Sequence, residues 1–121
     1  MLHNNQSKGK LGEDLAATYL QKKGYSIISR NFNSPFGEID LIATFKNTLI
    51  FIEIKTRSGN EYGAPQEAVT PWKIKSITKT GQYFRLLHPK LPEALQIDVI
   101  AISLNAEKNL PQIGHLENVT G

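Results

Sequence analysis

Two apolar runs decide how this chain folds: Gly37-Glu38-Ile39-Asp40-Leu41-Ile42-Ala43 and, after a short polar break, Leu49-Ile50-Phe51-Ile52-Glu53-Ile54-Lys55-Thr56-Arg57. Both runs are rich in Ile, Leu and Phe and are bounded by polar residues, which is typical of β-strands. A two-residue turn at Lys46-Asn47 would join the two strands into an antiparallel hairpin. The sequence therefore predicts a hairpin at the centre of the fold, with charged residues inside an otherwise apolar pattern.

The predicted hairpin places carboxylates close together on one face. Because side chains alternate along a strand, the turn at 46–47 sets Asp40 opposite Glu53 and Glu38 opposite Lys55. Opposed residues have Cβ atoms about 4.5 to 5.5 Å apart, so facing like charges are destabilising unless they are neutralised. Mg²⁺ binds one or two carboxylates together with water and phosphate oxygens. The pattern thus predicts a divalent-metal site at Asp40 and Glu53, with Lys55 placed to hold a phosphate or a metal-bound water.

A purely structural interpretation of the same charges competes with the metal site. Glu38 could pair with Lys55 across the strands, and Glu53 could pair with Arg57 along one strand. Surface ion pairs of this kind contribute only about 0 to 1 kcal/mol each. They also leave Asp40 opposite a like charge, which favours the metal site.

The order of these residues resembles a known nuclease signature. Asp40 followed by Glu53-Ile54-Lys55 is similar to the Asp and Glu-x-Lys of the PD-(D/E)xK superfamily, and the two longer runs resemble the YraN family of small bacterial proteins. The resemblance extends from Gly12-Glu13 to His115 and implies a core similar to that of archaeal Holliday-junction resolvases. Such a core is an α/β fold of the restriction-endonuclease-like αβββαβ type, with a mixed central sheet flanked by helices.

The resemblance also implies an activity and a set of site residues. It implies a DNA endonuclease that depends on Mg²⁺ or Mn²⁺, acts on branched DNA and forms a homodimer able to make paired cuts. Asp40 and Glu53 would ligate the metal, Glu13 would complete or support the site, and Lys55 would position or activate the attacking water. These assignments are expectations for the structure to address.

The position of Glu13 has two interpretations. Residues 7–23 have helical periodicity, and Glu13 falls at the edge of the apolar face, where its side chain should look toward the sheet. An acidic residue in the first turns of a helix interacts favourably with the macrodipole. Alternatively, Gly12-Glu13 matches the helix-borne acidic residue that the resemblance brings to the metal centre.

A second helix is predicted to begin at Thr70-Pro71 and to end before Pro89. Gly81 lies on its apolar stripe, which suggests close packing on the sheet. The segment from Trp72 to Lys90 contains no acidic residue and five basic ones, Lys73, Lys75, Lys79, Arg85 and Lys90. A solvated helix face and a nucleic-acid contact are both open interpretations. Lys73 at the inner edge of the helix and Arg57 at the end of its strand are the candidate phosphate contacts.

The remaining elements complete one α/β domain over residues 1–121, with residues 1–6 as a loose terminus. Strands are predicted at 25–30 and 96–104 and a short edge strand at 112–116, while the polar residues 31–35 are expected to form a loop. We expect Asp98 to form a salt bridge or an edge charge, and His115 to be structural.

Composition sets the outer limits on function. The 121-residue chain has a net charge of +3 and a pI near 9.2, which permits a nucleic-acid partner. The absence of Cys removes disulfides, zinc-thiolate sites and Cys nucleophiles. We expect no membrane partner and a cytoplasmic location, because neither a bilayer-spanning run nor a signal peptide is present.

The leading hypothesis is therefore a metal-dependent endodeoxyribonuclease that hydrolyses phosphodiester bonds. Two alternatives of other classes remain. One is a nucleic-acid-binding module that keeps the nuclease fold without cutting, and the other is a protein-interaction subunit whose acidic cluster is incidental.

Overall fold

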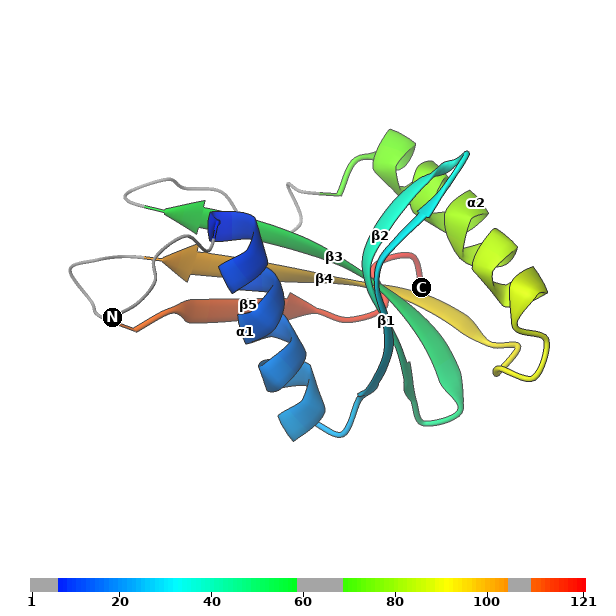
Figure 1. Ribbon diagram of the computed structural model, residues 1–121, viewed down its shortest axis with the longest axis horizontal. Helices are drawn as coiled ribbons and strands as arrows, with labels where there is room; N and C mark the ends of the chain where they lie inside the picture. The colour runs from blue at the N-terminus through cyan, green and yellow to red at the C-terminus, as the bar shows by residue number, and fades with distance from the viewer. Residues whose placement is uncertain (1–6, 59–68, 105–109) are drawn as a thin grey trace.

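The computed structural model describes residues 7–58, 69–104 and 110–121, so the predicted loose terminus at residues 1–6 lies outside the described residues. The elements follow the chain in the order α1 (Lys8–Lys22), β1 (Ser26–Ser34), β2 (Gly37–Phe45), β3 (Thr48–Ser58), α2 (Pro71–Leu87), β4 (Leu95–Leu104) and β5 (Gln112–Leu116) (Figure 1). This order confirms the predicted αβββαβ core, to which β5 adds an edge strand.

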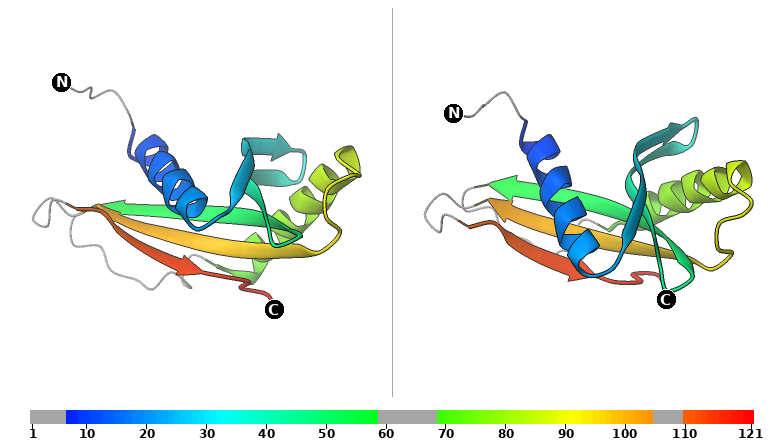
Figure 2. Two further views of the ribbon diagram at one scale, coloured as in Figure 1. Left: turned by 90° about the horizontal axis from the view of Figure 1, so that it is seen from below. Right: turned by 60° about the horizontal axis from the view of Figure 1, so that its bottom comes forward.

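The five strands form one mixed sheet in the order β1-β2-β3-β4-β5. The β3–β4 pair is parallel, and the other neighbours are antiparallel. One cluster of buried residues packs α1 on the sheet through Ala16, Leu20, Leu41, Ile52 and Ile100. A second cluster packs α2 on the sheet through Ile42, Phe51, Ile77, Phe84 and Ile97. Side chains that alternate along β2 and β3 thus supply both clusters, and we call the two sides of the sheet the α1 face and the α2 face (Figure 2).

The predicted β2–β3 hairpin is confirmed over its paired part. Lys46 and Asn47 both have positive φ, 51° and 58°, as a two-residue type I′ turn requires. The register runs from Phe45–Thr48 to Leu41–Ile52, as the turn predicts.

Beyond Leu41, the two strands of this hairpin separate. Within the described residues the β2–β3 ladder ends at Leu41–Ile52, and Glu38 pairs with Asn33 of β1. The predicted position of Glu38 opposite Lys55 is therefore wrong. Strand β3 continues along β4 as far as Ser58–Leu104, while β1 and β2 bend away from the sheet as a separate ribbon (Figure 1). The separation leaves a fork between β2 and residues 53–58 of β3.

Both helices begin and pack as the sequence predicts. The Ser7 and Thr70 hydroxyls accept hydrogen bonds from the backbone N–H groups of Lys10 and Lys73, at 3.1 and 3.0 Å. A Cβ at Gly81 would collide with the Phe51 ring, which confirms the close packing of α2 on the sheet. No helix in the described ranges is long and apolar enough to cross a membrane.

The first strand differs from its prediction. Strand β1 extends to Ser34 and includes the polar residues 31–33, which were expected to lie in a loop. Asn31 adopts a φ of 53°, a conformation that Asn tolerates better than most residues, and the pairing is irregular between Ile27 and Ser29. Because β1 is an edge strand of the sheet, polar side chains can remain solvated there, and polarity did not mark the end of the strand.

Candidate functional site

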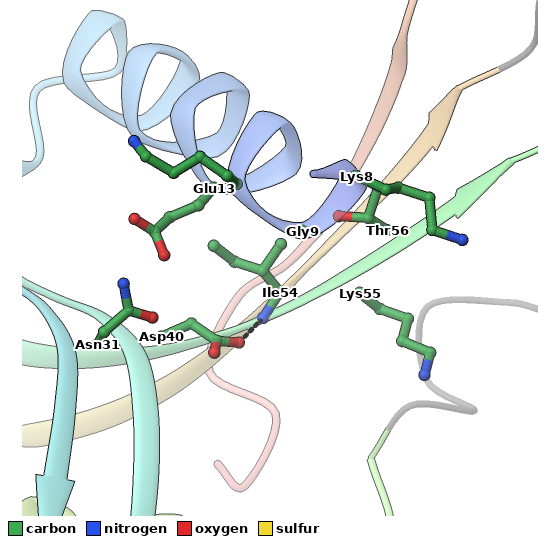
Figure 3. Close-up of a pocket in the computed structure, with 9 residues that line it drawn as sticks. Lys8, Gly9, Glu13, Asn31, Asp40, Ile54, Lys55 and Thr56 are labelled. Carbon is green, nitrogen blue, oxygen red and sulfur yellow. Dashed lines mark hydrogen bonds between the residues drawn. The ribbon is translucent and has the colours of Figure 1, made fainter. Parts of the chain in front are cut away.

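A cavity of about 430 Å³ opens at the fork between β2 and β3. Its walls come from the start of α1, from β1 and β2, and from the end of β3 (Figure 3). The ionisable or polar side chains in its lining include Glu13, Asn31, Asp40, Lys55 and Thr56. We call this space the fork cavity.

Asp40 lies one residue beyond the last β2–β3 pair. Its Oδ2 accepts a hydrogen bond of 2.7 Å from the backbone N–H of Ile54, drawn as a dashed line in Figure 3. The Asp40 carboxylate is thus the hydrogen-bond acceptor for the Ile54 amide of β3, at the point where β2 separates from β3. Burial raises the pKa of Asp40 above its ordinary value; the Ile54 N–H opposes that shift, and the charge of Glu38 adds to it.

Glu53 is the electrostatic neighbour of Asp40. Its side chain is 14% exposed, and its Oε2 lies 3.5 Å from the Lys73 Nζ of α2. Burial, followed by the charge of Asp40, raises the pKa of Glu53 to about 7, although Lys73 and Lys55 oppose the shift. The predicted interaction of two like charges is therefore present, although the β2–β3 ladder ends one pair before Asp40 and Glu53, which were predicted to pair directly.

Both carboxylates belong to the α2 face of the sheet. Asp40 alternates with Ile42, and Glu53 alternates with Phe51; Ile42 and Phe51 both pack against α2. Within the described residues, Asp40 contributes to the lining of the fork cavity, whereas Glu53 lies beside that lining and next to Lys73.

Glu13 faces the sheet, as its helical position predicts, and is only 8% exposed. A Cβ at Gly12 would collide with Thr56, so the glycine lets α1 approach the end of β3. In Figure 3 the Glu13 carboxylate points toward Asn31 and Asp40. Its Oε1 lies 3.4 Å from Arg30 Nη1, a partner that the sequence analysis did not identify.

The predicted basic residues have different surroundings. Lys55 is exposed and lines the fork cavity. Arg57 lies two residues further along β3, on the same face by alternation, and is partly buried. Lys73 contacts Glu53 directly, whereas the structural interpretation of the sequence paired Glu53 with Arg57.

The fork offers a hard divalent cation two carboxylate ligands, Asp40 and Glu53. Within the described ranges, no three or more His, Asp or Glu side chains converge closely enough to hold a metal ion. Asp40 and Glu53 interact, but Glu13 contacts Arg30. Two carboxylates are sufficient protein ligands for Mg²⁺ when water and phosphate oxygens fill the remaining positions. The role of Glu13 as a further ligand stays a prediction.

A second buried carboxylate lies elsewhere, on the α1 face. Asp98 is fully buried and accepts hydrogen bonds from Tyr25 Oη (2.8 Å), His115 Nε2 (2.8 Å), Gln96 Nε2 (2.9 Å) and the Asn118 backbone N (2.9 Å). Burial raises its pKa, but these hydrogen bonds outweigh burial and hold the pKa below its ordinary value. The predicted pairing of Asp98 is present as a contact with His115, which is a salt bridge when the imidazole is protonated; the edge-charge alternative is wrong, because β4 lies between β3 and β5.

Sequence comparisons identify similar proteins over most of the chain. The model of the uncharacterised protein family UPF0102, the YraN family, matches residues 12–102. A UPF0102 protein of Clostridium botulinum is 44% identical, with 87% of this chain and 86% of that protein covered. One from Geobacter sulfurreducens is 42% identical (96% and 90% covered), and one from Syntrophomonas wolfei is 39% identical (94% and 97% covered). The resemblance to the YraN family is therefore confirmed.

Proposed function

The chain belongs to the uncharacterised protein family UPF0102, and we propose that it is a DNA endonuclease that hydrolyses phosphodiester bonds with Mg²⁺ or Mn²⁺. The observation that carries the proposal is the pair formed by Asp40 and Glu53. Burial raises the pKa of both carboxyl groups; the charge of Asp40 adds to the shift at Glu53, and the charges of Glu38 and Glu13 add to the shift at Asp40. A divalent cation would relieve both effects, and perturbed groups of this kind are concentrated at functional sites.

Each residue of the proposed site has a role that its position supports. Asp40, anchored by the Ile54 N–H, and Glu53 would hold the metal, with Glu13 supporting them from α1. The bound metal would polarise the phosphate and lower the pKa of a bound water. Lys55 projects from the strand that carries Glu53 and orients the scissile phosphate or the attacking water.

Two further cations would contact the DNA backbone. Lys73 neutralises part of the charge of Glu53 in the metal-free protein. Once a metal ion neutralises Glu53 instead, the Lys73 ammonium is available to bind a phosphate. Arg57 lies further along β3 and would contact a neighbouring phosphate.

The proposed substrate is branched DNA, and the proposed location is the cytoplasm. Support for branched DNA comes only from the resolvase-like core that the sequence resemblance implies, which is an argument from fold. In a homodimer, two fork cavities would act on two strands and produce paired cuts.

Cleavage of labelled linear, flapped and four-way-junction DNA in Mg²⁺, Mn²⁺ or EDTA tests the proposal. We expect cutting that requires metal and is lost in Asp40→Asn. Asp14→Asn is the matched control, because it makes the same change on the surface of α1 and should still cut. Cutting that persists in EDTA or in Asp40→Asn would refute the metal site.

A non-catalytic nucleic-acid-binding module is the second candidate. The exposed basic side chains of α2 favour it, because they provide phosphate contacts whether or not a metal binds. Binding that weakens steeply with salt, without cleavage of any of the three substrates, would support this candidate over the nuclease.

A further inference from the structure

The outward side of α2 carries a row of exposed side chains that the proposed metal site does not use. Their spacing of three and four residues places them on one side of the helix. The row consists of Trp72, Lys75, Lys79, Gln82 and Leu86. Trp72 and Leu86 are 75% and 77% exposed, which is unusual for large apolar side chains. At 1.5 Å per residue the row is about 21 Å long.

The tip of the β1–β2 ribbon adds an aromatic ring beside this row. Phe36 is half exposed, and its backbone carbonyl accepts a hydrogen bond of 2.9 Å from Ser76 Oγ. Gly37 lies so close to Ser76 that a Cβ would collide with its hydroxyl. The Phe36 ring lies edge-on to Tyr83, with 5.9 Å between the ring centroids. These contacts hold Phe36 in place, so its ring is pre-organised for a ligand.

Shallow hollows flank Phe36 along the helix. One of about 290 Å³ lies between Phe36, Trp72 and Lys75, and one of about 320 Å³ lies between Phe36, Lys79 and Leu86. Aromatic rings and ammonium groups therefore alternate along a hollowed surface. We call this surface, formed by Phe36 with the row from Trp72 to Leu86, the α2 platform.

The charge of the platform decides which partner it fits. Helix α2 contains three Lys and one Arg but no acidic residue. A second copy of this chain docked through the same surface would bring Lys75 and Lys79 of both copies together, since a two-fold interface is self-complementary. Single-stranded nucleic acid instead presents phosphates to the ammonium groups and base faces to the aromatic rings.

We propose that single-stranded DNA binds along the α2 platform, with bases stacked on Trp72 and Phe36 and phosphates against Lys75 and Lys79. The choice of DNA rests on the proposed function, whereas the binding itself needs no metal. Trp72 is the neighbour of Lys73, whose ammonium contacts Glu53. The platform therefore begins at the residue next to Lys73 in the helix, and it would hold a single-stranded arm of the substrate.

Trp72 is the only tryptophan in the chain, so its fluorescence reports on this surface alone. In EDTA, we expect an oligodeoxythymidine of about 16 nucleotides to quench Trp72 emission, with affinity that falls as salt rises. Phe36→Ala and Lys79→Gln should each weaken binding about fivefold or more. Leu110→Ala and Lys22→Gln are matched controls on exposed residues away from the platform, and both should bind like the wild type.

Several outcomes would overturn the proposal. Trp72 emission unchanged by the oligonucleotide would do so, as would Phe36→Ala and Lys79→Gln variants that fold by circular dichroism and bind like the controls. Equally tight binding of duplex DNA would refute the single-strand assignment, and equally tight binding of oligouridine would refute the choice of DNA. Sedimentation that shows self-association lost in Trp72→Ala would assign the platform to a second copy.

The result of the oligonucleotide-binding experiment can be separated from the result of the nuclease assay. Asp40→Asn should bind the oligonucleotide like the wild type, because it leaves the platform intact. An inactive protein that quenches normally would refute the nuclease and keep the platform. An active nuclease whose Trp72 emission is not quenched would keep the nuclease and refute the platform.

Discussion

The molecule buries carboxylates in two places, around Asp98 and at the fork, and the two places differ in the number of hydrogen-bond donors that contact them. Asp98, on the α1 face, accepts four hydrogen bonds, including one from His115. At the fork, Asp40 accepts one backbone hydrogen bond, and Glu53 has a lysine at 3.5 Å. The pKa of Asp98 is lowered, whereas those of Asp40 and Glu53 are raised.

This difference separates a structural carboxylate from one that is ready for a ligand. Hydrogen bonds to Asp98 compensate for its burial, so its charge ties β4 to β5 and to Tyr25. The fork carboxylates have fewer compensating partners, the Ile54 N–H at Asp40 and Lys73 at Glu53, so burial still raises the pKa of both and their ionisation costs stability in the free protein. A site that binds a cation is expected to carry this kind of uncompensated charge.

The largest effect on stability is expected at Asp98. Asp98→Asn removes the charge that His115 pairs with and turns an amide N–H₂ toward other donors, so we expect a loss of about 3 to 5 kcal/mol in unfolding free energy at pH 7. Because the folded-state pKa of Asp98 is lowered, its contribution is present at neutral pH and is lost as pH falls through that pKa. Urea unfolding at pH 7 and at acid pH measures both.

The same substitution at the fork provides the comparison. Asp40→Asn should not destabilise the protein to this extent, since the pKa of Asp40 is raised by burial. A cost for Asp40→Asn as large as that for Asp98→Asn would remove the distinction between the two centres.

Lys55→Met is expected to slow cleavage strongly without unfolding the protein. Lys55 is exposed and lines the fork cavity, so its removal leaves the core unchanged. If it orients the phosphate or the attacking water, single-turnover cleavage should slow by roughly 10²- to 10³-fold. Lys46→Met, at the exposed β2–β3 turn, is the control, and a fully active Lys55→Met would remove Lys55 from the mechanism.

A smaller effect of opposite sign is expected for Glu53→Gln. The folded-state pKa of about 7 exceeds the ordinary value of 4.5, so ionisation of Glu53 costs stability as pH rises from 4.5 through 7. At pH 8, Glu53→Gln should therefore stabilise the metal-free protein by about 3 kcal/mol, with no gain below pH 4. Glu93→Gln, on the surface, should change little at either pH, and a destabilised Glu53→Gln at pH 8 would contradict the account.

Local patterns were sufficient to predict most of the fold. The helical periodicity from residue 7 and the cap at Thr70 place the helix starts, and the turn at Lys46-Asn47 fixes the register that brings Asp40 near Glu53. These features depend on residues close in sequence, whose backbone preferences are strong. The close packing of Gly81 on the sheet was also predicted, because a glycine on an apolar stripe indicates close approach; the structure identifies Phe51 as the residue it packs against.

The features that could not be predicted depend on distant parts of the chain. The end of the β2–β3 ladder at Leu41 follows from the pairing of β2 with β1, which no local pattern specifies. Arg30 beside Glu13 and Lys73 beside Glu53 are contacts between elements, set by how the helices pack on the sheet. The four hydrogen-bond donors to Asp98 come from four separate positions in the chain. Local patterns could therefore predict only that Asp98 would form either a salt bridge or an edge charge.

The most direct test of the account is the pKa of Glu53, measured by NMR titration of its side-chain carboxyl carbon with and without Mg²⁺. We expect a midpoint of about 7 in the metal-free protein, which falls when Mg²⁺ is added because the cation stabilises the ionised form. The Mg²⁺-induced fall should be absent in Asp40→Asn and retained in Asp14→Asn. A midpoint near 4.5 that Mg²⁺ does not change would contradict the central claim that the fork carboxylates form a metal site.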